Sequence, residues 1–367
     1  MNKRVRIKDI AEEAKVSRGT VDRVLHNRGK VAPDVVVKVK KAIENLGYSP
    51  NIFARTLANN KEYRIATLIP SSDRDVFWEQ PQIGILRAYE ATRDFGLIIQ
   101  QFFFNMDHPE SFVEEADKLI CSKPDGILMA TEFYRESIDF YNKVKALNIP
   151  LISFNTHLKE LKKVGYIGQD SYQSGKLAGR LFDISIKSPA KILMLHLGTS
   201  VDNAMHIMDK EKGLSDYFEE REDKRQIISE EFDSYQDADK LGRFLTQIFE
   251  RHQGIEGIFV TNSRAHNLLN ALNVIKHPED LCIVGFDLIE ENCAFLREGK
   301  INFLINQDPI RQGNLGFLTL ADHLLFQKDE VSLTFLPLDV VMPENLDLYL
   351  KSDTDTLSEI RTKILVA

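Results

Sequence analysis

The sequence predicts two kinds of fold in one chain: a small all-α head and a larger α/β body of two lobes. A chain of 367 residues is longer than one ordinary core supports, so two or three domains are expected. Residues 1–62 contain 14 Lys or Arg and 7 Asp or Glu, a formal charge of +7, although the whole chain carries −8. From residue 63 onwards, short apolar runs alternate with amphipathic helical patterns, which is typical of parallel sheets covered by helices.

The composition excludes several classes of protein. Hydrophobic residues make up 43% and charged residues 28%, as in globular chains. No run of about 18 apolar residues predicts a membrane span, and the basic start is not followed by the apolar core of a signal peptide. Cys121, Cys282 and Cys293 show neither metal-ligand spacing nor a disulfide framework. We therefore expect a cytoplasmic protein with no metal, no cofactor and no membrane partner.

The head shows three short helical patterns. Apolar residues recur at helical spacing over 7–15, 18–26 and 33–46. Ser17 suits the N-cap of the second helix, and Pro33 suits the first turn of the third. The first two helices are too short to bury a core alone, so the third completes it. This arrangement predicts a trihelical helix-turn-helix unit.

The outward face of the second helix favours a nucleic-acid contact. It carries Arg18, Gly19, Thr20, Asp22 and Arg23, which are basic or short. Such a face fits the major groove of double-stranded DNA, with its N-terminal residues directed at base edges. A small helical domain that binds another protein is the alternative, and the charge of the head favours DNA.

Residues 50–62 predict a further short helix between head and body. Pro50 and Asn51 mark a helix start, and Ala54 and Leu57 follow at helical spacing. The helix is too short and too poor in apolar surface to be stable in isolation. A marginal helix at this place is suited to act as a hinge and a switch.

Residues 7–58 read IKDIAEEAKVSRGTVDRVLHNRGKVAPDVVVKVKKAIENLGYSPNIFARTLA. This segment resembles, without gaps, the headpiece and hinge of the lactose-repressor (LacI/GalR) family of transcription regulators. The resemblance implies that Arg18, Gly19 and Arg23 read bases and that Leu57, beside Ala54, wedges into the minor groove. The complete set expected to contact DNA or to cap helices near it is Ser17, Arg18, Gly19, Thr20, Asp22, Arg23, His26, Asn27, Asn51, Ala54, Arg55 and Leu57.

Two positions of the second helix depart from the family pattern. Position 22 is Asp where the family usually has Ser, and Arg18 and His26 lie within reach on the same helix face. Two interpretations stay open: Asp22 orients Arg18 or accepts from a cytosine amino group, or it is a solvated acid that tempers non-specific affinity. Gly19 offers no side chain, so one base position is read weakly or by Arg18 alone.

The body predicts two doubly wound parallel sheets. Buried strands are expected over 64–70, 97–104, 126–130 and 150–154, and again over 191–197, 226–232, 257–261 and 282–286, with helices between them. Two such runs indicate two lobes, with a ligand held in the cleft at the carboxyl ends of the strands.

Polar and aromatic residues follow several of these strands. Phe77 and Trp78 come after the first strand, and Asn155, Asn262 and Asp287 follow later ones. Carboxylates and amides bind hydroxyl groups, while aromatic rings cover the apolar face of a sugar-like ligand. Each residue alone is more often a turn former or a cap, so the interpretation depends on their shared place at strand ends.

The body resembles the ribose-binding-protein type of periplasmic binding fold over about residues 63–345, most clearly at VGYIGQDSYQSGKLA, IVGFD and LINQDP. Two departures concern arginines of the family's pocket, which are replaced by Thr156 and Lys210. Because an ammonium cannot make the two-pronged contact of a guanidinium, a simple aldopentose is disfavoured and another sugar-like ligand is expected. The effector residues implied by the resemblance are Phe77, Trp78, Asn155, Asp170, Lys210, Asn262, Asp287 and Gln307.

The expected domain organisation follows from these patterns. The tail has apolar residues at helical spacing over too short a stretch for a tetramerisation helix, so a homodimer is expected. The expected boundaries are 1–49 for the head, 50–62 for the hinge, 63–345 for the body (one lobe 63–170 with 308–331, the other 171–307 with 332–345) and 346–367 for the tail.

The function expected from the sequence is a homodimeric regulator, most simply a repressor, that binds a pseudo-palindromic operator. A small polar effector would close the cleft and alter the pairing of the hinge helices. An enzyme is the first alternative, but no nucleophile-elbow, metal-ligand or phosphate-loop pattern is present, so no catalytic residue is expected. A transport-linked solute-binding protein is the second, and the attached head argues against it.

Overall fold

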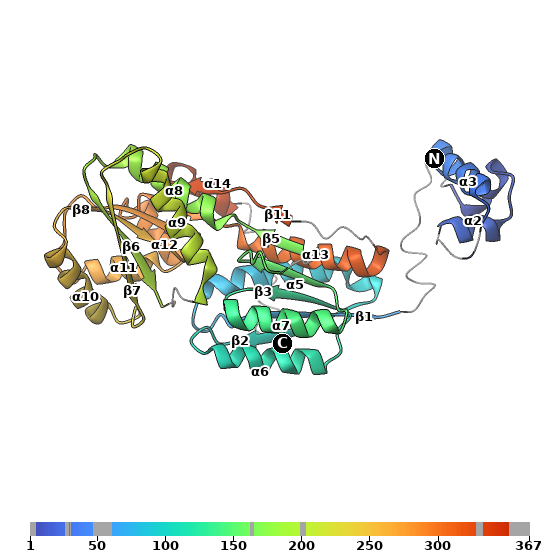
Figure 1. Ribbon diagram of the computed structural model, residues 1–367, viewed down its shortest axis with the longest axis horizontal. Helices are drawn as coiled ribbons and strands as arrows, with labels where there is room; N and C mark the ends of the chain where they lie inside the picture. Colours follow the sequence, from blue (N-terminus) through green and yellow to red (C-terminus); the bar gives the residue numbers. More distant parts are fainter. Residues whose placement is uncertain are drawn as a thin grey trace. The chain divides into compact units, whose positions relative to one another are not determined.

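The computed structural model describes residues 5–25, 29, 31–46, 61–161, 165–198, 203–327 and 333–351. The chain forms two compact units, Met1–Lys61 and Glu62–Ala367, which we call the head and the body (Figure 1). In the part of the chain that is described, no helix combines the length and the apolar character needed to cross a bilayer.

The head contains the three predicted helices, α1 (Ile7–Glu13), α2 (Arg18–Leu25) and α3 (Pro33–Leu46). Ser17 caps α2, because its Oγ accepts the backbone N–H of Thr20 at 3.1 Å. Ile10, Val21 and Val39, one from each helix, are fully buried and form the centre of the head's own core. The expected hinge helix lies largely outside the described residues.

The body contains two six-stranded sheets. The first lobe has the strand order β11-β5-β4-β3-β1-β2, and the second has the order β12-β10-β9-β8-β6-β7. Among the described strands, every pairing is parallel except that of β10 with β12, so the predicted fold of two doubly wound sheets is confirmed with one antiparallel edge. The strands are β1 (Tyr63–Pro70), β2 (Leu97–Phe104), β3 (Gly126–Ala130), β4 (Leu151–Asn155), β5 (Gly165–Gly168), β6 (Lys191–Leu197), β7 (Gln226–Phe232), β8 (Ile255–Val260), β9 (Cys282–Phe286), β10 (Phe303–Asn306), β11 (Leu333–Phe335) and β12 (Asp339–Val341).

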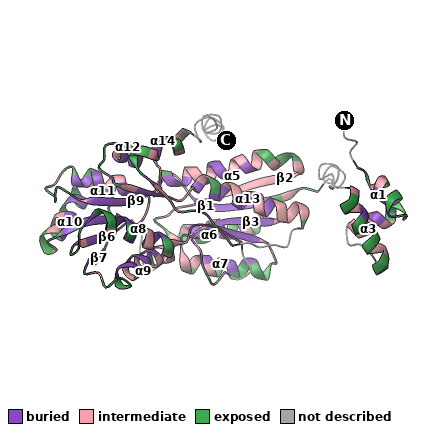
Figure 2. Ribbon diagram, turned by 90° about the horizontal axis from the view of Figure 1, so that it is seen from above, coloured by how far each residue is buried: buried purple, intermediate pink, exposed green. Residues whose placement is uncertain are grey.

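Helices cover both faces of each sheet, as the alternating pattern predicts (Figure 1). The strands are mostly buried and the outward helix faces exposed (Figure 2). The helices are α5 (Glu79–Thr92), α6 (Pro109–Cys121), α7 (Tyr134–Ala146), α8 (Ser171–Ser185), α9 (Met205–Glu219), α10 (Ala238–Arg251), α11 (Ala265–Leu272), α12 (Glu290–Arg297), α13 (Pro309–Phe326) and α14 (Pro343–Lys351), with short 3₁₀ turns η1 (Val76–Trp78) and η2 (Arg93–Phe95).

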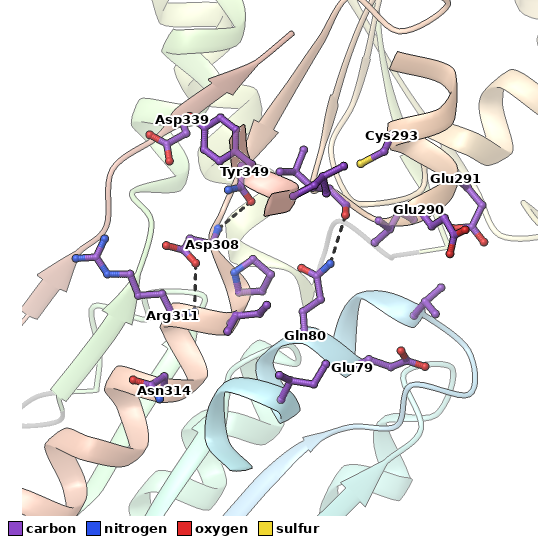
Figure 3. Close-up of a pocket in the computed structure, with 18 of the residues that line it drawn as sticks. Glu79, Gln80, Glu290, Glu291, Cys293, Asp308, Arg311, Asn314, Asp339 and Tyr349 are labelled. Carbon is purple, nitrogen blue, oxygen red and sulfur yellow. Dashed lines mark hydrogen bonds between the residues drawn. The ribbon is translucent and has the colours of Figure 1, made fainter. Parts of the chain in front are cut away.

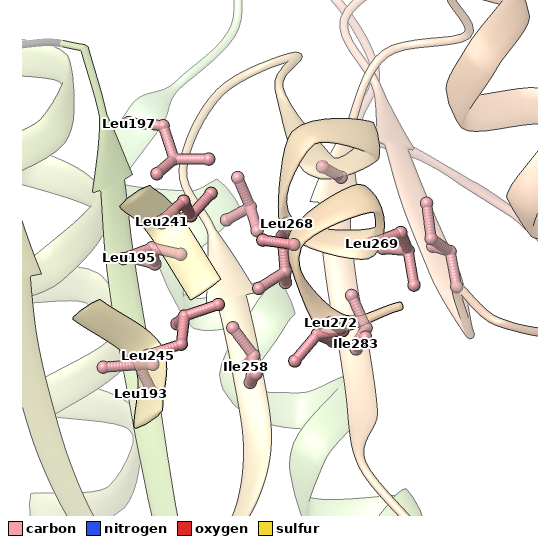
Figure 4. Packing of buried hydrophobic residues seen from close by; sticks show 14 of the residues in the cluster. Leu193, Leu195, Leu197, Leu241, Leu245, Ile258, Leu268, Leu269, Leu272 and Ile283 are labelled. Carbon is pink, nitrogen blue, oxygen red and sulfur yellow. The ribbon is translucent and has the colours of Figure 1, made fainter. Parts of the chain in front are cut away.

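Each lobe has its own apolar core. Figure 4 shows part of the second lobe's core, where leucines of β6 and α10 interdigitate with those of α11. Leu195, Leu241 and Leu268 in this cluster are fully buried. Such close packing fixes the positions of the strand ends, and the strand ends carry the polar residues of the cleft.

The two lobes are joined by three crossings of the chain, and the third differs from the expected boundary. Residues 332–345 were expected to belong wholly to the second lobe. Instead β11 pairs in parallel with β5 of the first lobe, and the chain crosses only before β12. The reason is that β11 is too short to show a periodic pattern, so only pairing reveals its sheet. The tail boundary expected at 345/346 also falls inside α14.

The side chain of Gln169 links the three crossings by hydrogen bonds. Its Nε2 donates to the carbonyl of Asn306 at 2.7 Å and to that of Pro337 at 3.0 Å, while Gln169 itself lies in the first crossing. The side chain is buried. One amide therefore joins the segments about which the lobes would move.

Candidate functional site

A cavity between the lobes collects most of the residues that were expected to bind an effector. Seven of the eight line it, and Asp170 does not. Asp170 is instead the N-cap of α8, where its Oδ1 accepts the backbone N–H of Gln173 at 3.1 Å. The seven that the fold brings together are Phe77, Trp78, Asn155, Lys210, Asn262, Asp287 and Gln307.

The first wall of the cavity is the turn that follows β1. Asp75 caps η1, since its Oδ1 accepts the backbone N–H of Phe77 at 3.1 Å. This cap fixes Phe77 and Trp78 edge to face, with ring centroids 5.0 Å apart, and Trp78 also packs against Phe154. Both rings are buried, so they form a rigid apolar wall.

Asn155 and Asp287 occupy equivalent places in the two lobes. Asn155 is the last residue of β4, and Asp287 comes directly after β9. Both have left-handed backbones, with φ of +71° and +66°. Asn and Asp tolerate this conformation better than other non-glycine residues, and such strain is concentrated at functional sites. Each also has a buried side-chain oxygen, Oδ1, that lacks a hydrogen-bond partner within the described part of the chain. Two acceptor oxygens, one from each lobe, are thus left for a donor that the protein does not supply.

The other polar atoms of these two residues are held in place. Asp287 Oδ2 accepts from Gln307 Nε2 at 2.9 Å. Asn155 Nδ2 donates to Glu132 Oε1 at 2.5 Å, and the Asn155 backbone N–H donates to Gln312 Oε1 at 3.0 Å. Because these bonds orient both side chains before any ligand arrives, the two free oxygens are preorganised acceptors.

Lys210 enters the cavity from α9. Its Nζ donates to the Thr261 carbonyl at 2.7 Å and lies 3.8 Å from the centroid of the Phe286 ring. Burial lowers the pKa of Lys210 and raises that of Asp287, while the opposite charges partly offset both shifts. Burial also raises the pKa of Glu132 to about 7. The charges of Lys210, Asp287 and Glu132 therefore depend on how much water the cavity holds.

Two histidines near Lys210 are uncharged at neutral pH. Burial, with a smaller contribution from Lys210, lowers the pKa of His196 to about 4. The pKa of His206 is lowered well below its usual range by burial, then by Lys210 and His196. His206 Nδ1 lies 3.3 Å from Thr156 Oγ1, which joins the lobes. As neutral rings, both can donate or accept hydrogen bonds without adding charge.

An ion pair crosses the cavity from lobe to lobe. Arg264 Nε lies 3.2 Å from Asp75 Oδ2, and the two side chains are only 5% and 11% exposed. The second lobe holds the guanidinium through the carbonyls of Leu197 and Gly198 and through the ring of Tyr235. With this bridge formed, the cavity measures about 40 Å³, enough for a few waters but not for a sugar ring. The two lobes are thus in direct contact across the cavity.

Three charged residues that line the cavity were not anticipated from the sequence: Asp75, Glu132 and Arg264. All three lie within a few residues of a strand end, as do those that were anticipated. Including every charged residue in these loops would have found them. Their pairings could not have been found in this way, because the partners are far apart in the chain.

Figure 3 shows a second cavity, of about 720 Å³, between α5 of the first lobe and α12 and α14 of the second. Gln80 Nε2 donates to the Leu288 carbonyl across it at 3.4 Å. Although it is larger, it contains none of the residues that line the cleft cavity. We assign the site to the cleft because the preorganised acceptors and the buried charges lie there.

In the head, α2 presents the face expected to contact DNA. Ser17, Arg18, Gly19 and Arg23 are exposed, while Thr20 and Asp22 are half-buried. A Cβ on Gly19 would meet only Ser17 Oγ at 3.8 Å, so nothing in the described part of the head requires glycine there. The remaining expected contacts, His26, Asn27, Asn51, Ala54, Arg55 and Leu57, lie outside the described residues.

A helix-turn-helix head joined to a two-lobed body with a polar, preorganised cleft defines a DNA-binding regulator that responds to a small ligand. Residues 6–51 match the family model of bacterial regulatory proteins of the lacI family, and residues 65–328 match that of the periplasmic binding protein domain. The chain belongs to the lacI family of regulators whose body is a periplasmic binding protein domain.

Known proteins agree with this membership. The chain is 26% identical to the ribose operon repressor of Halalkalibacterium halodurans over 294 residues, 77% of this chain and 80% of the relative. A protein described as a LacI transcriptional regulator from Bacteroides fragilis is 27% identical, with a TM-score of 0.72 over 79% of this chain and all of the other. GanP, a glucose-galactose binding protein from Geobacillus stearothermophilus, is 21% identical and shares the fold, with a TM-score of 0.69 over 78% of this chain and 99% of its own.

Proposed function

We propose that the protein is a homodimeric repressor whose effector is a sugar or a sugar derivative bound in the cleft. The observation that carries the proposal is the pair of buried acceptor oxygens, Oδ1 of Asn155 and Oδ1 of Asp287, which face one cavity from opposite lobes. Adjacent hydroxyl groups of one sugar ring can donate to both, and Phe77 with Trp78 offers an apolar wall. The curated relatives include operon repressors for ribose and sucrose.

The effector would act by replacing the direct bridge between the lobes. Entry of a ring requires the Asp75–Arg264 contact to lengthen, because the present cavity is too small. New hydrogen bonds to both lobes would then set a different closure angle. Rotation about the crossings tied by Gln169 would pass this change to the rest of the body.

On the DNA side, α2 would enter the major groove. Arg18 and Arg23 would read bases, Gly19 would leave room for one, and Asp22 would orient Arg18 or remain a solvated acid. A recognition helix of eight residues spans few base pairs, so two heads of a homodimer on a pseudo-palindromic operator are expected. The hinge segment with Leu57 would lie at the centre of the operator, and the cytoplasm would be the compartment.

The proposal is tested on the effector side by thermal shift with a panel of neutral sugars, sugar phosphates and nucleobases. A sugar should raise the melting temperature of the wild type and not of Asp287→Asn, which keeps the shape but alters the acceptor. Glu219→Ala, an exposed change outside the cleft, should respond like the wild type. Stabilisation by a nucleobase alone would contradict a sugar effector.

The DNA side is tested by selection of bound sequences from a random duplex library. The wild type should select a two-fold symmetric site, and Arg18→Ala should lose preference at one position of each half-site. Gly19→Ala, which the head accommodates, should alter the preference at a neighbouring position. A monomer by light scattering on the selected duplex would contradict the dimer.

A further inference from the structure

The cleft does not end at the small central cavity. A third cavity, of about 600 Å³, which we call the outer cavity, opens between the ends of β2 and β3 in the first lobe and the ends of β6 and β7 in the second. Met106 and Glu132 line both cavities, so the two adjoin. Resting on the sugar effector proposed above, we propose that the outer cavity is a second sugar subsite and that the effector is an oligosaccharide of at least two rings.

Size supports this assignment. The central cavity measures about 40 Å³ and the outer cavity about 600 Å³, which is within the range of small-molecule sites of roughly 300–1,000 Å³. When the Asp75–Arg264 bridge yields to one ring, the space gained at the centre continues directly into the outer cavity past Glu132. A monosaccharide would fill the centre alone and leave most of the cleft to water.

The lining of the outer cavity has the mixture of groups that binds a sugar ring. Phe133 of the first lobe and Tyr235 of the second contribute aromatic rings. The Tyr235 ring is fixed from the side of the central cavity, where the Arg264 guanidinium lies 4.3 Å from its centroid. Ser234 and Gln236 add exposed hydroxyl and amide groups. Aromatic side chains beside exposed hydroxyl and amide groups suit a ligand ring that has both apolar C–H groups and hydroxyl groups.

The charge of the side chains that line the outer cavity restricts which kind of sugar ring can bind there. Among the described residues that line the outer cavity there are four acidic side chains, one of them Glu132, and no Lys, Arg or His. Arg74 and Lys240 lie beside two of them, Asp107 and Asp237, but do not line it. Repulsion therefore disfavours a uronate, sulfate or phosphate on the outer ring, and a neutral ring is expected.

The two lobes also contact each other beside the outer cavity, through Asn203, which lines it. Asn203 Oδ1 accepts from the Arg135 backbone N–H at 3.0 Å, and its Nδ2 donates to Glu136 Oε2 at 2.9 Å. Asn203 belongs to the second lobe, while Arg135 and Glu136 begin α7 of the first. Because both lobes wall the outer cavity, a ring bound there contributes to the free energy of closure as well as to affinity.

The test compares saccharides of increasing length by calorimetry with the full chain. The probes are glucose, galactose, mannose, xylose and arabinose, each with its neutral disaccharide and trisaccharide, and disaccharides with an outer uronic acid. For one series, affinity should rise at least about tenfold from one ring to two, as an added stacked ring predicts. An outer uronate should lower affinity by about tenfold.

Two variants test the outer subsite separately from the proposal that the effector is a sugar. Ser234→Trp fills the outer cavity from an exposed position and should reduce disaccharide affinity to that of the monosaccharide. Asp239→Trp, which is exposed on the first turn of α10 and outside the lining, should bind both like the wild type. Equal affinity for one and two rings, or disaccharide binding unchanged in Ser234→Trp, would overturn the outer subsite alone. Binding of no saccharide of any length would overturn the sugar effector and the subsite together.

Discussion

At the scale of single residues, the cleft is notable for buried charge. Glu132 is 7% exposed, Asp287 1% and Lys210 3%. Removing three charged groups from water is unfavourable, and each is only partly compensated by the others and by Asn155 and Gln307. Buried ionisable groups of this kind are concentrated at binding and catalytic sites, which agrees with the proposed effector site.

The raised pKa of Glu132 has a consequence for stability. The unfolded carboxyl titrates near its ordinary value of 4.5, and the folded one near 7. The folded state therefore holds the proton more tightly, and stability is lost as pH rises from about 4.5 to about 7. Glu132→Gln removes this loss and keeps an acceptor for Asn155.

The melting temperature of Glu132→Gln relative to the wild type should thus be higher at pH 8 than at pH 5. The full difference in unfolding free energy is about 3 kcal/mol if the shift is complete. Scanning calorimetry without effector at both pH values measures it. A difference between the two proteins that is the same at pH 5 and pH 8 would contradict a raised pKa.

At the scale of elements, pairs of glycines set where the cleft helices lie. Helices α8 and α9 cross with their backbones in contact. A Cβ on Gly175 would lie 2.1 Å from the Lys210 carbonyl oxygen, and one on Gly213 would lie 2.0 Å from that of Tyr172. The first lobe repeats the arrangement, because Gly84 and Gly313 bring α5 and α13 equally close. The close crossing of α8 and α9 determines how far Lys210 reaches into the cavity.

Gly213→Ala should therefore destabilise the body by about 1–3 kcal/mol, since the clashing atoms are backbone and cannot rotate away. Urea unfolding followed by fluorescence of the protein's one tryptophan measures this change. Glu219→Ala, on the exposed face of the same helix, should stay within about 0.5 kcal/mol of the wild type. Equal stability of Gly213→Ala and Glu219→Ala would show that the helices can separate without loss.

At the scale of the whole molecule, the chain contains two independently packed units. The head has its own core around Ile10, Val21 and Val39, and the body has cores in both lobes. Head and body thus have separate sources of stability. The sequence predicts a marginal helix over residues 50–62, between the head and the body.

Ile10→Ala should uncouple the two units. The change removes a fully buried side chain from a small core and should destabilise the head by about 2–5 kcal/mol. Binding to duplex DNA should be lost, while effector binding and the melting transition of the body stay unchanged. Gel shift, calorimetry and circular dichroism on one preparation give all three readings. A lower melting temperature of the body would contradict separate cores.

Much of the fold could be predicted because its signals are local. The three head helices follow from apolar spacing and from Ser17 as a cap, and most strands of the body begin and end within two residues of their predicted bounds. The cleft residues Asn155 and Asp287 were predictable because the end of a parallel strand marks the cleft edge. Asp170 shows the limit of that rule, since it also follows a strand but is used as a helix cap.

The sequence by itself determined the kind of protein: a basic helix-turn-helix head, an α/β body of two lobes, and strand-end residues suited to a polar ligand. Only the tertiary structure decided the sheet of β11, the bridge from Asp75 to Arg264, the bond from Asn155 to Glu132, and the continuation of the cleft into the outer cavity. The reason is physical. Periodicity and caps depend on residues within one or two turns of each other, whereas these contacts join residues up to 189 positions apart, and only the packing of whole elements brings them together.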